Sequence, residues 1–166
     1  MHVRRARLDD AEALRAIYNL EVTTSTVTFD LVPRSEAQQR AWLAERSGAH
    51  AVVVAEEGEE LLGFGALSPY RDRPAYTTTV EDSVYVRRDV QGRGVGRALL
   101  AELVAVATAS GFHTAIARVV GGHEASLALH RGQGFELVGT EREVGRKFNR
   151  WLDVVVLQRM LGPPSP

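Results

Sequence analysis

Hydrophobic positions recur along this chain at two spacings, and each spacing predicts one type of secondary structure. Apolar side chains at helical spacing predict helices that begin near Asp9 and near Ser35, and further helices at 94–110 and 124–133. Runs rich in β-branched residues predict strands at 3–6, 51–55, 61–67, 77–86, 115–120, 135–144 and 151–160. The resulting order is β-α-α-β-β-β-α-β-α-β-β, which indicates an α/β fold with a mixed central sheet.

Polar residues at the ends of these patterns predict how the first two helices begin and end. Asp9 with Glu12 and Ser35 with Gln38 have the spacing of a capping box, in which two side chains satisfy free backbone N–H groups. Residues 23–29 are rich in hydroxyl side chains, which compete with helical hydrogen bonds. We therefore expect a loop over 23–29.

The composition is typical of a globular protein. The chain has 166 residues, of which 45% are hydrophobic and 25% charged. It contains no cysteine, which excludes disulfides, thiolate metal ligands and a cysteine nucleophile. We expect one domain over residues 1–161, followed by a flexible tail at 162–166.

Charge and hydropathy argue against nucleic-acid and membrane partners. The formal net charge is −1, which gives no field that attracts a polyanion or an anionic lipid surface. No run approaches the roughly 20 apolar residues needed to cross a bilayer, and no apolar segment follows the basic N-terminus as in a signal peptide. We expect a cytoplasmic protein.

A glycine-rich turn at 91–96 lies between a predicted strand and a predicted helix. The first N–H groups of a helix lack internal partners and carry partial positive charge, so the turn suits a phosphate or pyrophosphate. Arg97 follows Gly96 where a Walker A motif requires lysine, and where a Rossmann fingerprint requires a small residue. A turn that only joins strand to helix stays an alternative.

The residues around this turn resemble those of the GNAT N-acetyltransferases. Residues 86–99 are similar to that family's hydrophobic strand followed by Gln/Arg-x-x-Gly-x-Gly/Ala. Residues 127–135 are similar to its later helix and Gly-Phe turn, and the similarity extends from about Val3 to Met160. The resemblance implies a GNAT domain with a splayed mixed sheet flanked by helices, and acetyl-CoA as the co-substrate.

The same resemblance implies a coenzyme A site. In the GNAT family the turn amides hold the pyrophosphate, and the strand before the turn pairs with the pantetheine arm. His123 stands where many members carry an asparagine that contacts this arm. The implied cofactor-binding residues are Val84, Tyr85, Val86, Gln91, Gly92, Arg93, Gly94, Val95, Gly96, Arg97, His123 and Ser126.

Four separated segments resemble the phosphinothricin acetyltransferases within that family, namely residues 24–29, 71–76, 81–86 and 147–154. Those enzymes acetylate the α-amine of phosphinothricin, methionine sulfone and methionine sulfoximine. The resemblance implies a small, amino-acid-like amine as acceptor, and a homodimer. The implied substrate-binding residues are Phe29, Arg71, Arg73, Tyr76, Lys147 and Trp151, for which core packing or simple surface exposure are the alternatives.

Glu81 and His130 are the candidate catalytic residues. An alkylamine must lose its ammonium proton before it attacks a thioester, and Glu81 is a carboxylate in an otherwise apolar, hydroxyl-rich run. Asp82 is expected to point to the opposite face, because side chains alternate along a strand. His130 stands where many GNAT enzymes carry the tyrosine that protonates the leaving thiolate. A solvated edge carboxylate and an inert histidine at a helix end stay alternatives.

Other functions also stay open. The acceptor can be a protein N-terminus, a polyamine or an aminoglycoside, and the chain can be a non-catalytic acyl-CoA-binding module. Arg71 and Arg73 argue against cationic acceptors, and the presence of Glu81 with His130 argues against a binding module. The histidines show no metal-ligand spacing, so no metal is expected.

Overall fold

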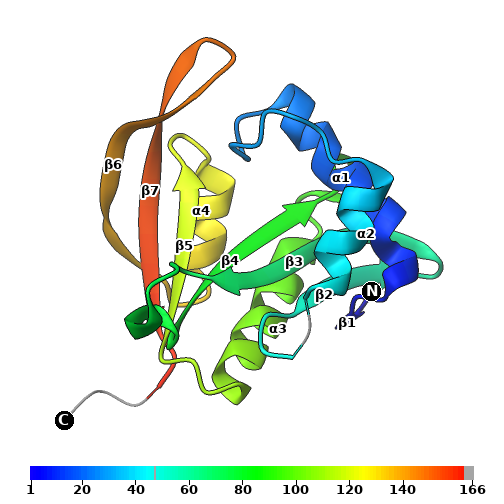
Figure 1. Cartoon of the computed structure of the whole chain (residues 1–166), viewed down its shortest axis with the longest axis horizontal. Coiled ribbons are helices and arrows are strands. Elements are labelled where there is room, and N and C mark those ends of the chain that lie inside the picture. Colours follow the sequence, from blue (N-terminus) through cyan, green and yellow to red (C-terminus); the bar gives the residue numbers. More distant parts are fainter. Residues whose placement is uncertain (47, 163–166) are drawn as a thin grey trace.

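The computed structural model describes residues 1–46 and 48–162 (Figure 1). The helices and strands follow the predicted order, with three short 3₁₀ turns at Leu8–Asp10, Pro74–Tyr76 and Arg88–Val90. The strands are β1 (His2–Arg5), β2 (Val52–Glu57), β3 (Glu60–Pro69), β4 (Thr79–Val86), β5 (Thr114–Val120), β6 (Glu136–Lys147) and β7 (Arg150–Met160). The helices are α1 (Ala11–Thr24), α2 (Glu36–Ala44), α3 (Val95–Ala109) and α4 (Glu124–Arg131).

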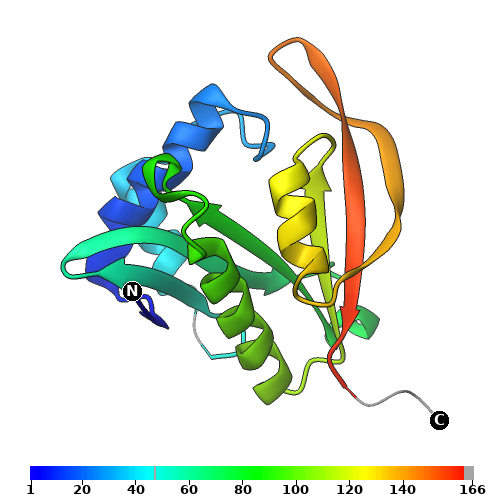
Figure 2. The same ribbon diagram turned by 180° about the vertical axis from the view of Figure 1, so that it is seen from behind.

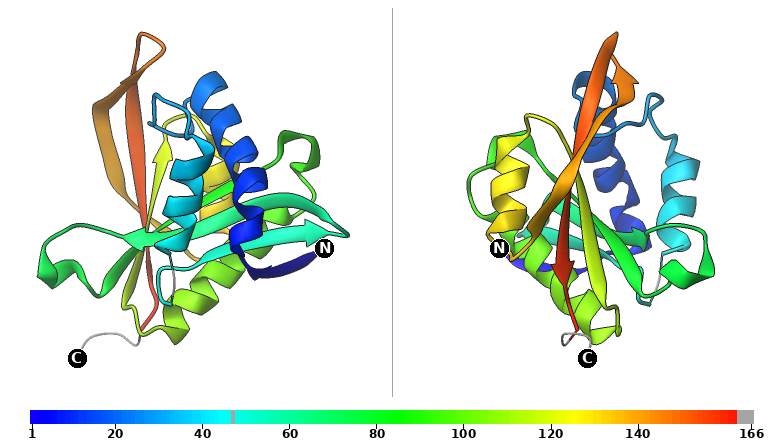
Figure 3. Two further views of the ribbon diagram at one scale, coloured as in Figure 1. Left: turned by 45° about the vertical axis from the view of Figure 1, so that its right-hand side comes forward. Right: turned by 90° about the vertical axis from the view of Figure 1, so that its left-hand side faces the viewer.

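The strands form one seven-stranded mixed sheet in the order β1-β2-β3-β4-β5-β7-β6. Every neighbouring pair is antiparallel except β4 and β5, which run parallel. Helices α1 and α2 cover one face and α3 and α4 cover the other, as the two views of Figure 3 show. The predicted α/β architecture, with a mixed sheet flanked by helices, is confirmed.

The parallel pair β4–β5 splits the sheet. The two strands are paired from Thr79 with Thr114 to Asp82 with Ala117, and beyond that point they diverge (Figure 2). On its other edge β4 stays paired with β3 up to Val86. The edge of residues 83–86 that faces β5 is therefore left without a strand partner in the described part of the chain.

Helix α3 anchors the half of the sheet that carries the split. Leu99, Leu100 and Leu103 lie on one stripe of this helix and are fully buried, as the helical spacing predicts. A side chain at Gly65 of β3 would lie 2.7 Å from Leu103 Cδ1, so the glycine permits close approach of helix to sheet.

Two local predictions near the N-terminus are wrong. The Asp9–Glu12 capping box does not form: Glu12 pairs instead with Arg15, one turn along the helix, at 2.6 Å. Helix α1 also continues to Thr24 rather than ending before residue 23. The hydroxyls of Thr23 and Thr24 donate to carbonyls one turn earlier, so they are satisfied without breaking the helix.

Other local predictions are confirmed or extended. The Ser35–Gln38 capping box forms at the start of α2, with both of its hydrogen bonds present. The final hairpin is longer than predicted, because β6 runs to Lys147 and turns through Phe148 and Asn149. The predicted tail at 162–166 lies outside the described residues except for Gly162. No described helix is long and apolar enough to span a bilayer.

Candidate active site

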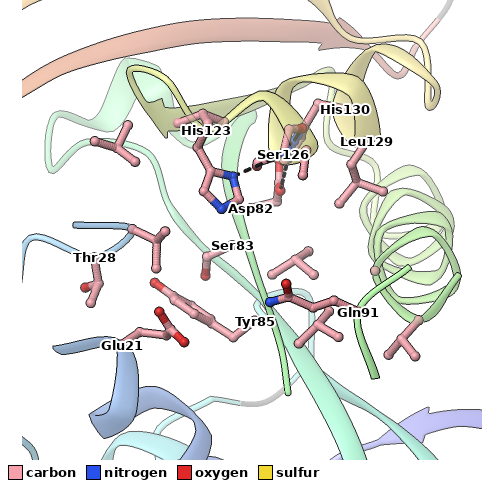
Figure 4. Close-up of a pocket in the computed structure, with 18 of the residues that line it drawn as sticks. Glu21, Thr28, Asp82, Ser83, Tyr85, Gln91, His123, Ser126, Leu129 and His130 are labelled. Atoms are coloured by element: carbon pink, nitrogen blue, oxygen red, sulfur yellow. Dashed lines mark hydrogen bonds and ion pairs between the residues drawn. The ribbon is translucent and has the colours of Figure 1, made fainter. Parts of the chain in front are cut away.

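A pocket of about 660 Å³ lies at the split between β4 and β5 (Figure 4). Its walls come from both strands, the glycine-rich turn, the start of α3, helix α4, and the loop that follows α1. The pocket exists because β5 leaves β4 after residue 82 while both strands stay held by other neighbours. It brings together residues as far apart in the sequence as Glu21 and Val154.

The glycine-rich turn presents its backbone to this pocket. Gly92 and Gly94 have φ angles of 79° and 83°, a left-handed conformation that favours glycine, and Gly94 is the N-cap of α3. In the described residues, no acceptor is found for the backbone N–H groups of residues 92–97. These donors and the positive end of α3 form a site suited to an anionic group.

The arginines around the turn point in different directions. Arg97 lines the pocket, together with Gln91, Gly92, Gly94, Val95 and Gly96. Arg93 does not line it, because its guanidinium pairs with Glu57 of β2 at 2.8 Å. Of the arginines predicted to contact the cofactor, Arg97 alone faces the pocket within the described chain.

The end of β4 supplies one wall. Val84, Tyr85 and Val86 all line the pocket, next to the strand edge that β5 leaves open. The Tyr85 ring stacks on Phe64 at 5.1 Å between centroids. Burial raises the pKa of the Tyr85 hydroxyl, so the phenol stays neutral. This wall is therefore apolar in its side chains and offers hydrogen bonds through its backbone.

Glu81 lies at the point where the strands part. Its side chain is half-buried and lines the pocket, and its carboxylate has no hydrogen-bond partner among the described residues. Burial raises the pKa of Glu81 above its ordinary value, and the charge of nearby Arg118 partly opposes this rise. An unpaired, partly desolvated carboxylate with a raised pKa has the properties expected of a general base.

His130 of α4 is buried against Asp82 of β4. The His130 Nε2 atom lies 3.0 Å from Asp82 Oδ2, and both side chains are nearly inaccessible to solvent. The second carboxylate oxygen, Oδ1, is buried without a hydrogen-bond partner in the described part of the chain. His130 is therefore the group that compensates the buried charge of Asp82.

The environment of His130 favours its protonated form. Its Nδ1 atom lies 2.7 Å from the Ser126 carbonyl oxygen, so both ring nitrogens face oxygen acceptors and both can donate. Burial lowers the pKa of His130, but the hydrogen bond and charge of Asp82 outweigh it, and the pKa is raised overall. Asp82 and His130 thus form a buried ion pair in the wall of the pocket.

His123 begins helix α4. Its Nδ1 atom accepts a hydrogen bond from the Ser126 backbone N–H at 3.2 Å, which satisfies one of the free donors of the helix. The His123 ring and the Ser126 hydroxyl both line the pocket (Figure 4). Their contact with a cofactor stays a prediction.

The predicted substrate-binding residues are dispersed. Phe29 lines the pocket, whereas Arg71, Arg73, Tyr76, Lys147 and Trp151 do not. The Arg71 guanidinium lies over the Tyr76 ring at 5.5 Å, and Trp151 is 61% exposed. Lys147 is buried, and its Nζ donates to the Thr28 carbonyl at 2.8 Å, which ties the β6–β7 hairpin to the loop after α1.

Asp82 and Arg118 are charged residues of the pocket wall to which the sequence analysis assigns no role. Asp82 was placed on the face opposite Glu81, but its contact with His130 joins residues 48 positions apart. Arg118 was not considered, although it is the one charged residue of β5, whose other side chains are buried. A lone charge in a buried apolar strand is a signal that could have identified Arg118.

Comparisons with known proteins identify the family of this chain. The family profile described as "Acetyltransferase (GNAT) domain" matches residues 3–156. The phosphinothricin N-acetyltransferase of Streptomyces coelicolor is 41% identical, with 97% of this chain and 96% of the relative covered. The L-methionine sulfoximine/L-methionine sulfone acetyltransferase of Pseudomonas paraeruginosa is 37% identical, with 97% and 95% covered.

A solved structure shows the same fold. The GNAT superfamily phosphinothricin acetyltransferase of Sinorhizobium meliloti, in complex with AcCoA, matches with a TM-score of 0.93 at 39% identity. The match covers 97% of this chain and 88% of that one. Both the architecture and the sequence are therefore shared along almost the whole length.

Proposed function

Because this chain belongs to the GNAT family and is an N-acetyltransferase, we propose a specific acceptor for it. The acceptor is the α-amine of a small amino-acid-like compound, of the phosphinothricin or methionine sulfone type. The observation that carries the proposal is the pocket at the β4–β5 split. It joins an anion-binding helix start to a half-buried carboxylate that has no hydrogen-bond partner in the described chain. The names of the relatives support the acceptor class.

The pocket fits the acetyl-CoA that the relative from Sinorhizobium meliloti contains. The unpaired N–H groups of residues 92–97 and Arg97 suit a pyrophosphate. The open edge of residues 83–86 suits an extended, amide-containing arm, which would take the place of the missing strand. When bound, acetyl-CoA supplies the thioester carbonyl that the amine attacks.

In this proposal Glu81 takes the ammonium proton of the acceptor. The raised pKa of Glu81 brings it closer to that of the amine, so proton transfer becomes less unfavourable. Because the carboxylate has no hydrogen-bond partner among the described residues, none has to be displaced before it accepts the proton. The lone pair that this step frees attacks the thioester, and the chain provides no cysteine for a covalent intermediate.

His130 is proposed to supply the proton that the departing thiolate takes up. Asp82 raises the pKa of His130 and so favours the protonated imidazole, but both ring nitrogens are directed at other groups, namely Asp82 and the Ser126 carbonyl. The Ser126 hydroxyl lies 3.4 Å from His130 Nδ1 and also lines the pocket. It can therefore give its proton to the thiolate and take up a proton from His130. Asp82 stabilises the charged form of His130.

We also propose a homodimer. Large apolar side chains are exposed on the loop after α1 and at the end of the β6–β7 hairpin, namely Leu31, Val32, Val144, Phe148 and Trp151. The Lys147–Thr28 hydrogen bond joins the two segments, so their exposed apolar side chains lie on adjacent parts of the surface. Such an exposed apolar surface is typical of a protein–protein interface. Sedimentation at micromolar concentration tests this: a monomer in wild type, or no shift toward monomer with Trp151→Glu, contradicts the proposal.

Thiol release from acetyl-CoA tests the proposed function directly, because a chain without cysteine contributes no background signal. The acceptor panel is methionine sulfone, methionine sulfoximine and phosphinothricin against spermidine, an aminoglycoside and a peptide with a free N-terminus. We expect the highest kcat/KM for one of the first three, with an acetylated product by mass spectrometry. A higher kcat/KM for one of the last three refutes the acceptor class. Acetyl-CoA binding without turnover on any amine refutes catalysis.

A further inference from the structure

Arg118 and Glu81 occupy the same face of the split. Glu81 is the register partner of Ile116 in the parallel pair, so their side chains share a face of the sheet. Arg118 lies two residues beyond Ile116 and therefore projects on that face as well. Both charged side chains line the pocket, and their charges are close enough for Arg118 to oppose the rise in the pKa of Glu81.

Glu141 of β6 orients the Arg118 guanidinium. Arg118 Nη1 donates to Glu141 Oε1 at 3.0 Å, and Arg118 Nη2 donates to the other carboxylate oxygen. This bidentate contact uses two of the five N–H donors of a guanidinium. In the described part of the chain the other three N–H donors of Arg118 have no acceptor. The Arg118 side chain is 30% exposed.

Stability alone does not account for this arrangement. A partly exposed arginine–glutamate pair contributes little to the stability of the folded state. The other side chains of β5 are buried and uncharged, so Arg118 is the one place where the strand presents a charge to the pocket. A guanidinium with free donors next to a pocket matches a carboxylate ligand.

We propose that Arg118, oriented by Glu141, binds the α-carboxylate of the acceptor while Glu81 faces its α-ammonium group. This inference rests on the proposed function and narrows it. A free α-amino acid carries both charges on one carbon and fits the Glu81–Arg118 pair. Polyamines, and peptides whose amino group has no adjacent carboxylate, leave Arg118 without a partner, and the site selects against them.

The test compares methionine sulfone with its α-carboxamide in wild type, Arg118→Met and Glu141→Gln. Methionine keeps the length of the side chain and removes its charge. In wild type the free acid is expected to have a kcat/KM at least tenfold above the amide. Arg118→Met is expected to lower kcat/KM for the free acid about 10- to 100-fold, mainly by raising KM. The kcat/KM for the amide should stay within about twofold of the wild-type value. Glu141→Gln is expected to give a smaller loss of the same kind.

Arg40→Met, on the exposed surface of α2, is the matched control and should leave both substrates unchanged. Retained activity on the amide shows that the Arg118 variant is folded. An unchanged acid-to-amide ratio in Arg118→Met overturns the proposal, as does a wild-type enzyme that prefers the amide while still acetylating amino acids. If wild type acetylates neither compound, the proposed function fails and this inference fails with it.

Discussion

Replacing Glu81 with glutamine keeps the size of the side chain and removes its ability to accept a proton. An unperturbed α-amino group has a pKa of about 8, and the adjacent free carboxylate of an amino acid raises it further, so at most roughly one acceptor molecule in ten carries a free lone pair at pH 7. At ~1.4 kcal/mol per pH unit, this deprotonation accounts for at least about 1.4 kcal/mol of the barrier. A base positioned to take the proton during the reaction typically contributes about 10²- to 10⁴-fold in rate. We expect Glu81→Gln to lower kcat/KM by this factor at pH 7.

The pH dependence distinguishes a base from a residue that only positions the acceptor. Because the pKa of Glu81 is raised, the wild-type rate should fall on the acid side at a pH above the ordinary carboxyl range. The variant should lack this limb and approach wild type at alkaline pH, where the amine is already free. Thiol-release rates from mildly acidic to alkaline pH measure both effects.

Stability provides an independent check on the same variant. A carboxyl group whose pKa is raised by burial makes the folded state less stable as pH rises through that pKa, since ionisation is penalised. Glu81→Gln should therefore keep or raise the melting temperature at pH 7 while activity falls. Glu136→Gln, at the exposed start of β6, is the control. If Glu81→Gln has the wild-type kcat/KM at every pH, Glu81 has no catalytic role. If kcat/KM of the variant stays below wild type even at alkaline pH, Glu81 positions the acceptor and does not take its proton.

Other variants probe the remaining parts of the site. Gly94→Val forces a β-branched residue into a φ of 83°, and calorimetry should show at least tenfold weaker acetyl-CoA binding by a folded protein; unchanged affinity refutes the assignment. Gly145→Ala places a methyl group against the ring of Phe29, which lines the pocket. We expect the KM for the acceptor to rise while the affinity for acetyl-CoA stays constant. Equal effects on the acceptor KM and on acetyl-CoA affinity would refute a role of Phe29 in acceptor binding. Asp82→Asn removes the partner that raises the pKa of His130. The stabilisation of the folded state by this ion pair is fully present below about pH 6.5 and is lost as the pH rises through the raised pKa of His130. Urea unfolding should therefore show a loss of about 3 kcal/mol at pH 6 that shrinks by pH 9, and a pH-independent loss contradicts the ion pair.

The sequence by itself determined the order of the elements and the location of the glycine-rich turn. Both depend on local chemistry: hydrophobic spacing selects helix or strand, and glycine is favoured where φ is positive, as at Gly92 and Gly94. The Ser35–Gln38 capping box was predictable for the same reason, since it joins residues three positions apart. The Asp9–Glu12 box failed because Arg15, equally local, competes for the Glu12 carboxylate.

The resemblance to acetyltransferases added the individual pocket residues that local patterns cannot supply. It implied roles for Glu81, His123 and Ser126, and all three line the pocket. It did not account for Arg93, whose guanidinium is drawn to Glu57 of a neighbouring strand and away from the pocket. A family pattern gives the position of a residue along the chain, whereas the direction of a long side chain depends on nearby charges.

Only the tertiary structure decided where the sheet splits and which charges meet there. Pairing of β4 with β5 stops at Asp82 and Ala117, whereas β4 stays paired with β3 up to Val86 and β5 stays paired with β7 up to Val120. The Asp82–His130 and Arg118–Glu141 contacts join residues 48 and 23 positions apart, on elements brought together by sheet order. Local patterns hold no information about such distant contacts, because burial and strand pairing along the whole chain determine which side chains share a face.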